Sequence, residues 1–103
     1  MMSRVNLHNK LKPHACKFHA IGNVTRLSIL YILAREPMEF ARIVHRFKMS
    51  PSLAAHHLKQ LVSAGLVTKT KVGKLVTYYL AEDTIKEMSI LLRKFLSLQS
   101  ESN

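Results

Sequence analysis

Residues 50–65 read SPSLAAHHLKQLVSAG and predict a helix whose two ends are marked by suitable residues. The hydroxyl of Ser50 can cap the first turn, and Pro51 tolerates the first helical position. Gly65 can adopt the left-handed backbone that commonly follows a helix, so the helix should end near Ser63. At about 100° per residue, one side of this helix is apolar and would pack against a core. The residues on that side are Ala54, Leu58 and Leu61.

The other side of this helix carries small, polar or cationic side chains and no acid. Its residues are Ser52, Ala55, His56, Lys59, Gln60 and Ser63, and Ser50 adds its hydroxyl at the first turn. Such a face can enter the major groove of DNA without clash or repulsion, and its polar side chains can meet the donors and acceptors of base edges. The alternative interpretation is an ordinary solvated face.

Two strand-like segments follow the helix. Residues 66–70 and 75–80 are rich in β-branched and aromatic side chains, which favour strands. Between them, residues 71–74 read KVGK and predict a basic hairpin tip, since Gly73 can supply the positive φ of a tight turn. We expect three lysines to contact phosphates beside the helix, which adds affinity but no sequence preference. They are Lys69, Lys71 and Lys74; the alternative is an ordinary charged loop.

A helix is also expected immediately before residue 50. It runs from about residue 39 to 47, and its outer face carries Arg42 and Arg46, four residues apart, as further candidates for DNA contact. A short turn would join it to the next helix. Residues 39–63 therefore predict a helix-turn-helix, and residues 66–80 predict a β wing.

Apolar helices are expected on both sides of this unit. Residues 24–34 are apolar on nearly every side, as in a buried helix, and Asn23 suits its N-cap. Upstream, residues 5–21 predict one broken helix or two short ones, with Pro13 in the first turn of the second piece. A final helix should span residues 82–98, with fraying beyond.

The first and last helices carry more apolar surface than one subunit can cover, and an exposed patch of this kind favours association. We therefore expect a homodimer joined through residues 1–21 and 82–98. The candidate interface residues are Leu11, Ala15, Phe18, Met88, Leu91, Leu92 and Phe95.

Together these segments predict one domain of 103 residues, mainly α with a small β-hairpin, in the order α-α-α-α-β-β-α. The chain has 16 Lys and Arg against 6 Asp and Glu, a formal net charge of +10, and no acid between Phe40 and Ala81. Polyanion binding is the commonest reason for such an excess, and general cationic solubility is the alternative. We therefore expect double-stranded DNA as the partner.

Several classes of protein are disfavoured by the same sequence. No apolar run reaches the roughly 18 residues of a membrane helix, and no secretory signal is expected at residues 1–12. The single cysteine, Cys16, permits neither an internal disulfide nor a paired-cysteine zinc finger, and it fits a cytoplasmic location. Without paired carboxylates, a phosphate-binding glycine loop or a nucleophile motif, we expect neither an enzyme nor a cofactor.

Residues 21–80 resemble the ArsR family of winged-helix repressors. The resemblance rests on GNVTRLSIL at 22–30, SPSLAAHHLKQL at 50–61, AGLV at 64–67 and GKLVTYYL at 73–80. It implies a homodimer joined through the first and last helices, and operator binding near a promoter that a signal relieves. Lys48 stands where the family commonly has glycine, and Ala55 replaces a frequent serine.

The usual metal-sensing residues of that family are missing. Many members carry a cysteine pair on the helix before the recognition helix, but residues 38–43 read MEFARI. Others use carboxylate and histidine ligands on the last helix, where Asp83 is present but no histidine follows. We therefore expect no metal; a small-molecule or redox inducer is not identified by the sequence.

His14, Cys16 and His19 form the one alternative ligand group. Cysteine and histidine are good zinc ligands, but residues two apart do not share a helical face, so a structural role is favoured. Cys16 as a redox-sensing thiol is a second alternative. His57 should pack and form hydrogen bonds at the edge of the core.

The leading hypothesis is a sequence-specific DNA-binding transcriptional regulator acting as a dimeric repressor. The alternatives are a winged-helix module for protein–protein contact and a non-specific architectural DNA-binding protein.

Overall fold

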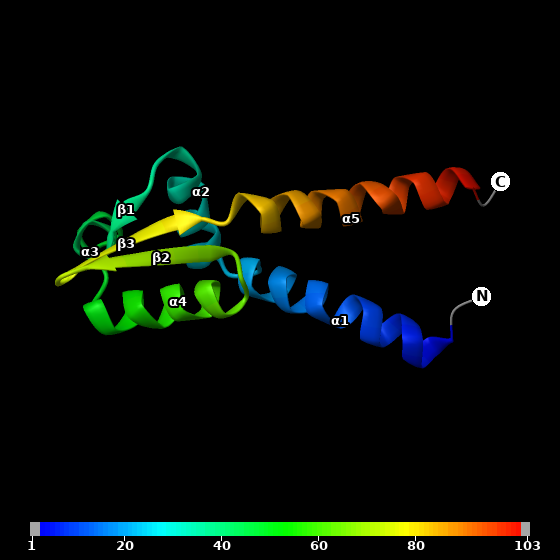
Figure 1. Ribbon diagram of the computed structural model, residues 1–103, viewed down its shortest axis with the longest axis horizontal. Coiled ribbons are helices and arrows are strands. Elements are labelled where there is room, and N and C mark those ends of the chain that lie inside the picture. The colour runs from blue at the N-terminus through cyan, green and yellow to red at the C-terminus, as the bar shows by residue number, and fades with distance from the viewer. Residues whose placement is uncertain (1–2, 102–103) are drawn as a thin grey trace.

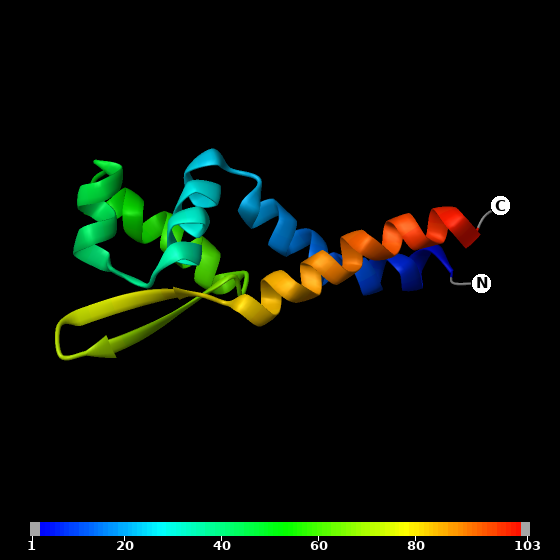
Figure 2. The same ribbon diagram turned by 90° about the horizontal axis from the view of Figure 1, so that it is seen from above.

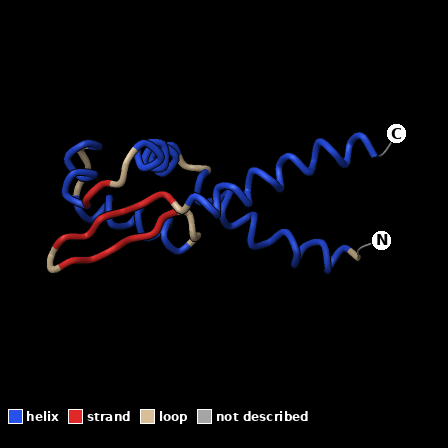
Figure 3. Tube along the Cα trace, turned by 45° about the horizontal axis from the view of Figure 1, so that its top comes forward, coloured by secondary structure: helices blue, strands red, loops and turns tan. Residues whose placement is uncertain are grey.

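Two long helices, α1 (Arg4–Ile21) and α5 (Glu82–Glu101), extend from one end of a smaller body of helices and strands (Figure 1). This computed structural model describes residues 3–101 and measures 54 × 26 × 24 Å. Both termini lie at the far end of the two arms (Figure 3). The body contains α2 (Val24–Arg35), β1 (Met38–Glu39), α3 (Phe40–Phe47), α4 (Pro51–Ser63), β2 (Val67–Val72) and β3 (Leu75–Leu80).

Side-chain caps begin helices α2 and α4 where the sequence predicted them. The Asn23 side chain accepts a hydrogen bond from the backbone N–H of Arg26 at 3.0 Å. The Ser50 hydroxyl accepts from the N–H of Leu53 at 3.1 Å, and Pro51 takes the first helical position. Each cap satisfies an N–H that has no partner inside the helix.

Residues with left-handed backbone conformation follow the ends of α3 and α4 and form the turn of the hairpin. Within residues 3–101, positive φ occurs at Gly65 (+77°), Gly73 (+62°) and Lys48 (+50°). After Gly65, the N–H of Leu66 donates to the carbonyl of Leu61 at 3.0 Å, a bond that closes the end of α4. Lys48 is the strained member, because a side chain in this conformation costs roughly 1–2 kcal/mol.

The sheet has a third strand, which was not predicted from the sequence. The antiparallel strand order is β1-β3-β2, and Met38 pairs with Tyr78 of β3. The element order is therefore α-α-β-α-α-β-β-α, and the expected α-α-α-α-β-β-α was incomplete. A strand of two residues is too short to show alternation. In addition, β2 continues to Val72, so the hairpin turn is only Gly73 and Lys74.

The expected break in the first helix was wrong. α1 is one continuous helix with Pro13 inside it. Pro13 is exposed, so water can reach the backbone that its missing N–H leaves unpaired. At the other end, α5 continues to Glu101, beyond the predicted end at residue 98. No helix within residues 3–101 is both long and apolar enough to cross a membrane.

The core lies where α2, α4 and the sheet meet. Its fully buried side chains are Ile29, Ile43, Leu58, Leu61, Leu66 and Val67, each less than 2% exposed. Met88 of α5 joins this cluster and is only 4% exposed. Its own subunit therefore leaves little of Met88 for the predicted dimer interface.

Replacing Lys48 with glycine should raise the free energy of unfolding by about 0.5–1 kcal/mol. Glycine avoids the steric penalty of the left-handed conformation but loses more chain entropy on folding. Lys48→Ala removes the same charge and keeps the penalty, so it is the matched control. Urea unfolding of the three proteins measures the difference, and equal stability of the two variants would contradict the assigned strain.

Candidate nucleic-acid interface

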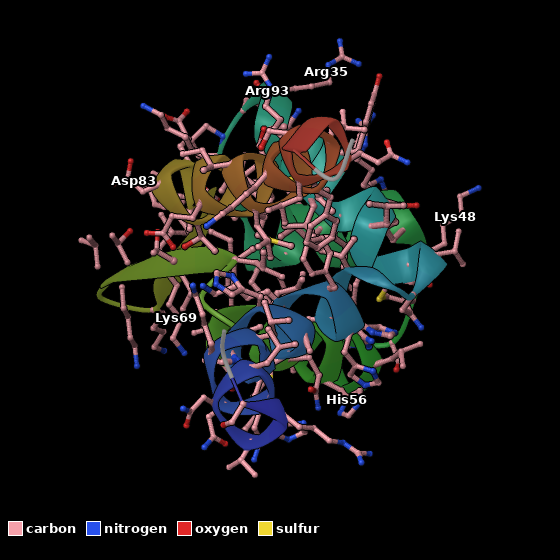
Figure 4. The ribbon with its side chains drawn as sticks, turned by 90° about the vertical axis from the view of Figure 1, so that its right-hand side faces the viewer. Arg35, Lys48, His56, Lys69, Asp83 and Arg93 are labelled. Carbon is pink, nitrogen blue, oxygen red and sulfur yellow. The ribbon has the colours of Figure 1, made fainter. Side chains whose placement is uncertain are left out.

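Helix α4 buries one side and exposes the other. Ala54, Leu58 and Leu61 are 0–1% exposed. The opposite side chains of Ser52, Ala55, His56 and Lys59 are all exposed. Figure 4, a view along the long axis, shows His56 pointing away from the body. The face predicted to meet base edges is therefore accessible.

Gln60 and Ser63, also predicted to contact DNA, lie in a different setting. Both are exposed, but both line a hollow of about 450 Å³ between the end of α4 and α1. Cys16 and His19 line the same hollow from α1. Since bases are read mainly by the N-terminal residues of a recognition helix, the part of α4 from Ser50 to Lys59 is the better candidate.

The β2–β3 hairpin forms the predicted wing and projects away from the helices (Figure 2). Side chains alternate along a strand, so Lys69 and Lys71 share one face of the hairpin with Val67. Lys74 occupies the turn, and all three lysines are exposed. This arrangement spreads positive charge from the side of the hairpin to its tip.

The two arginines of α3 have neighbours of their own. The guanidinium of Arg42 lies 3.2 Å from the carboxylate of Glu36. Arg46 lines a hollow of about 390 Å³ against α2, together with Tyr31 and Phe47. The charge of Arg42 is therefore partly neutralised within the subunit. The exposed lysines of the hairpin are better placed than the two arginines to contact phosphates.

The acidic side chains lie on elements other than α4 and the hairpin, although exposed Glu39 of β1 pairs with Thr77 of the hairpin strand β3. Glu82, Asp83 and Glu87 all fall at the start of α5, and Glu87 lies 3.6 Å from Lys17 of α1. In Figure 4, Asp83 and His56 point to different sides of the molecule. The exposed side of α4 and the hairpin thus form an acid-free surface, which we call the reading face. We define it by Ser50, Ser52, Ala55, His56, Lys59, Lys69, Lys71 and Lys74.

A buried polar contact supports α4 from behind. His57 is 8% exposed, and its Nδ1 lies 3.4 Å from a terminal guanidinium nitrogen of Arg26. The Nε of Arg26 donates to the carbonyl of Ala20 at 2.6 Å. Hydrogen bonding by His57 was predicted from the sequence, but Arg26 was not identified as its partner, because 31 residues separate the two positions.

Burial is the main cause that lowers the pKa of His57 below its ordinary value of 6.5, and the nearby charges of Arg26 and His56 act in the same direction. All three causes disfavour the protonated ring. His57 is therefore held in the neutral form that can accept a hydrogen bond from Arg26.

The alternative metal group in α1 is divided between two faces. His14 lines a groove toward α5, whereas Cys16 and His19 line the hollow beside α4. Within residues 3–101, no three His, Cys, Asp or Glu side chains come together in a way that could hold a metal ion.

An apolar groove of about 240 Å³ separates the two arms. Six of the seven residues predicted for a dimer interface are Leu11, Ala15, Phe18, Leu91, Leu92 and Phe95, and all six line it. His14 also lines the groove, and its Nδ1 is buried with no hydrogen-bond partner inside the subunit. The groove is otherwise hydrocarbon, and Phe95 is 51% exposed.

Comparison with known proteins shows several relatives. The family model for bacterial regulatory proteins of the arsR family matches residues 23–69. An uncharacterized HTH-type transcriptional regulator of Methanocaldococcus jannaschii is 38% identical over 72 residues, which is 69% of this chain and 81% of that protein. A homolog of the cadmium resistance regulatory protein CadC from Staphylococcus aureus is 32% identical over 72 residues, covering 69% of this chain and 60% of the homolog.

Solved structures show the same fold. An ArsR-like transcriptional regulator from Rhodococcus sp. RHA1 superposes with a TM-score of 0.82 at 24% identity, covering 91% of this chain and 89% of that one. The homodimeric winged helix-turn-helix DNA-binding domain of a possible ArsR-family regulator from Mycobacterium bovis has a TM-score of 0.74 at 26% identity. That match covers 99% of this chain and 94% of the other. The predicted winged helix-turn-helix is therefore confirmed.

The free energy of unfolding should fall on acidification because of His57. Its pKa is lowered in the folded state and returns to about 6.5 in the unfolded chain, so the unfolded state binds the proton more tightly. The contribution is complete above about pH 6.5 and is lost as the pH falls through the folded pKa. Urea unfolding at a series of pH values should show a shallower dependence for His57→Gln than for the wild type.

His56→Gln is the matched control for this measurement, because His56 is the exposed neighbour on the same helix. It should retain most of the pH dependence of the wild type, because burial and Arg26 lower the pKa of His57 more than His56 does. Identical pH dependence in the wild type and His57→Gln would contradict the lowered pKa.

Proposed function

The chain belongs to the arsR family of bacterial regulatory proteins, and from this premise we propose that it is a dimeric repressor that recognises a specific operator sequence. Members of this family are transcriptional regulators with a DNA-binding winged helix. The observation that carries the proposal is the reading face, where an exposed, acid-free side of α4 lies beside three exposed lysines of the wing.

We propose different tasks for the two parts of the reading face. The N-terminal half of α4 would enter the major groove, where Ser52, His56 and Lys59 can form hydrogen bonds with base edges. The hairpin would lie along the backbone, where Lys69, Lys71 and Lys74 can pair with phosphates. The first part supplies sequence preference and the second supplies affinity that depends on salt.

The proposed dimer joins two copies through the groove between α1 and α5. Exposed leucine and phenylalanine side chains line this groove, and covering them removes apolar surface from water. The unpartnered Nδ1 of His14 supports the same proposal, because a second copy can offer it a hydrogen bond. The related domain from Mycobacterium bovis is homodimeric. Two-fold symmetry would then present two α4 helices to successive major grooves.

We propose that this repressor works without the metal sites common in its family. The cysteine pair and the terminal-helix histidine are missing from the sequence, and the His14, Cys16 and His19 side chains lie on two separate faces. A signal would therefore have to act through another part of the molecule, such as the two arms.

Selection of bound fragments from a random-sequence duplex library, at low and at physiological salt, tests the proposal. A single enriched motif with two-fold symmetry is expected. Binding without enrichment would instead support a non-specific architectural protein. Absence of binding at low salt would support a module for protein contacts.

His56→Ala should weaken binding to the selected duplex by about tenfold or more and should weaken binding to random duplex much less. Loss of a base contact costs roughly 1–3 kcal/mol, and only the correct sequence makes that contact. Lys59→Ala should behave in the same way. Fluorescence anisotropy on both duplexes measures the effect, and equal losses on the two would remove these residues from base recognition.

Lys74→Ala should weaken binding to both duplexes alike. It should also reduce the slope of log affinity against log salt by about 0.9, the value for one phosphate contact. Lys86→Ala is the matched control, since this exposed lysine lies on α5 outside the reading face. An unchanged slope for Lys74→Ala would show that the wing does not meet phosphates.

Phe95→Glu should raise the dimer dissociation constant at least about 100-fold, because it would bury an unpaired carboxylate in an apolar interface. Ile90→Glu is the control, since Ile90 is 58% exposed on the same helix but does not line the groove. Sedimentation velocity should find the first variant monomeric and the second dimeric. A dimeric Phe95→Glu protein would place the interface elsewhere.

A further inference from the structure

Arg26 joins three helices through three separate groups. Its backbone N–H donates to the side-chain oxygen of Asn23, which caps the start of α2. Its Nε donates to the carbonyl of Ala20, near the end of α1, at 2.6 Å. Its terminal nitrogen contacts Nδ1 of His57 on α4 at 3.4 Å.

From this geometry we infer that Arg26 is a positioning residue for DNA recognition, which holds α4 against the dimer arm α1 through neutral His57 and releases it when His57 is protonated. The inference rests on the proposed function and adds a pH-sensitive link between the dimer helix and the reading face. Arg26 itself is partly buried and lies outside the reading face. Its effect on DNA is therefore indirect.

The chemistry of the two side chains determines the protonation state of the link. A guanidinium has five donors and no acceptor, so the His57 Nδ1 that it faces must accept. The ring proton then sits on Nε2, and the ring is neutral. A proton on Nδ1 would set two N–H groups against each other and place a second positive charge 3.4 Å from the first.

The charged groups that act on His57 oppose that second charge. Arg26 faces it from α2, His56 lies beside it on α4 with ring centroids 5.7 Å apart, and the α1 backbone carbonyl of Ala20 already accepts from Arg26. In the described part of the chain, the ion pairs join Lys17 to Glu87 and Arg42 to Glu36. Neither of these carboxylates forms an ion pair with Arg26 or His57. Burial and the neighbouring Arg26 and His56 therefore oppose protonation of His57.

The link joins the two regions that operator binding must coordinate. The end of α1 meets Arg26, and the same helix lines the dimer groove with Leu11, Ala15 and Phe18. On α4, His57 lies next to His56 of the reading face. Loss of the link would let the angle between arm and reading helix vary, which weakens simultaneous contact with two half-sites.

The first experiment compares Arg26→Met with Arg35→Met on the duplex recovered by selection. Both changes remove one arginine from α2, but Arg35 is exposed at the far end of that helix. Arg26→Met should lower affinity about tenfold, within the usual range of coupling between sites, with an unchanged salt slope. Arg35→Met should change affinity less than twofold. A reduced salt slope for Arg26→Met would mean a direct phosphate contact and would overturn the inference.

The second experiment measures affinity from about pH 7.5 to about pH 5.5. Acidification adds positive charge to histidines, which by itself strengthens binding to phosphates. Wild-type protein should nevertheless lose on the order of threefold in affinity, a coupling effect of the usual size. His57→Gln, whose side-chain oxygen can still accept from Arg26, should match the wild type at pH 7.5 and lose nothing at pH 5.5. His56→Gln should still show the loss on acidification.

Long-range ¹H–¹⁵N NMR of the free protein tests the link without DNA. The spectrum should show His57 with an unprotonated Nδ1 at pH 7.5, and Arg26→Met should perturb its shift. A proton on Nδ1 at that pH would overturn the inference whatever the protein binds. Normal operator binding with a flat pH profile would overturn the inference and leave the proposed function standing.

Discussion

Burial of one side of α4 is the constraint on which the rest of this structure depends. Ala54, Leu58 and Leu61 pack at 0–1% exposure against α2 and β2, and a rigid helix that buries one side must present the other. Each buried leucine is worth about 2–5 kcal/mol relative to alanine, whereas an exposed ion pair rarely exceeds about 1 kcal/mol. The apolar contacts therefore decide how α4 is held, and the surface charges decide what can approach it.

The distribution of charge follows from that division. Acids lie at the start of α5, at the end of α2 and on β1, and two of them are paired, Glu87 with Lys17 and Glu36 with Arg42. Neither of these ion pairs in residues 3–101 involves α4 or the hairpin. A chain of formal net charge +10 thus directs an uncompensated positive surface to one side, which attracts a polyanion before any base is contacted.

Features of the fold and of the reading face that depend on neighbouring residues could be predicted from the sequence. The Asn23 and Ser50 caps, the Gly73 turn and the outer side of α4 each depend on residues a few positions apart. Predictions failed where distant segments decide the outcome. The two-residue strand β1 exists only because β3 pairs with it, and Met88 is covered by a core assembled from other helices. The Arg26–His57 contact was missed for the same reason.

The proposed repressor, which would work without the metal sites common in its family, needs another way to convert a signal into a change at DNA, and α1 is the element suited to that task. Its residues from Leu11 to Phe18 line the apolar groove between the two arms, and its last turn meets α4 through one guanidinium and one imidazole. A hydrocarbon contact at that point would be insensitive to solution conditions. A buried histidine that faces a cation is stable only while it is neutral. The contact that fixes α4 therefore also makes the position of α4 depend on pH.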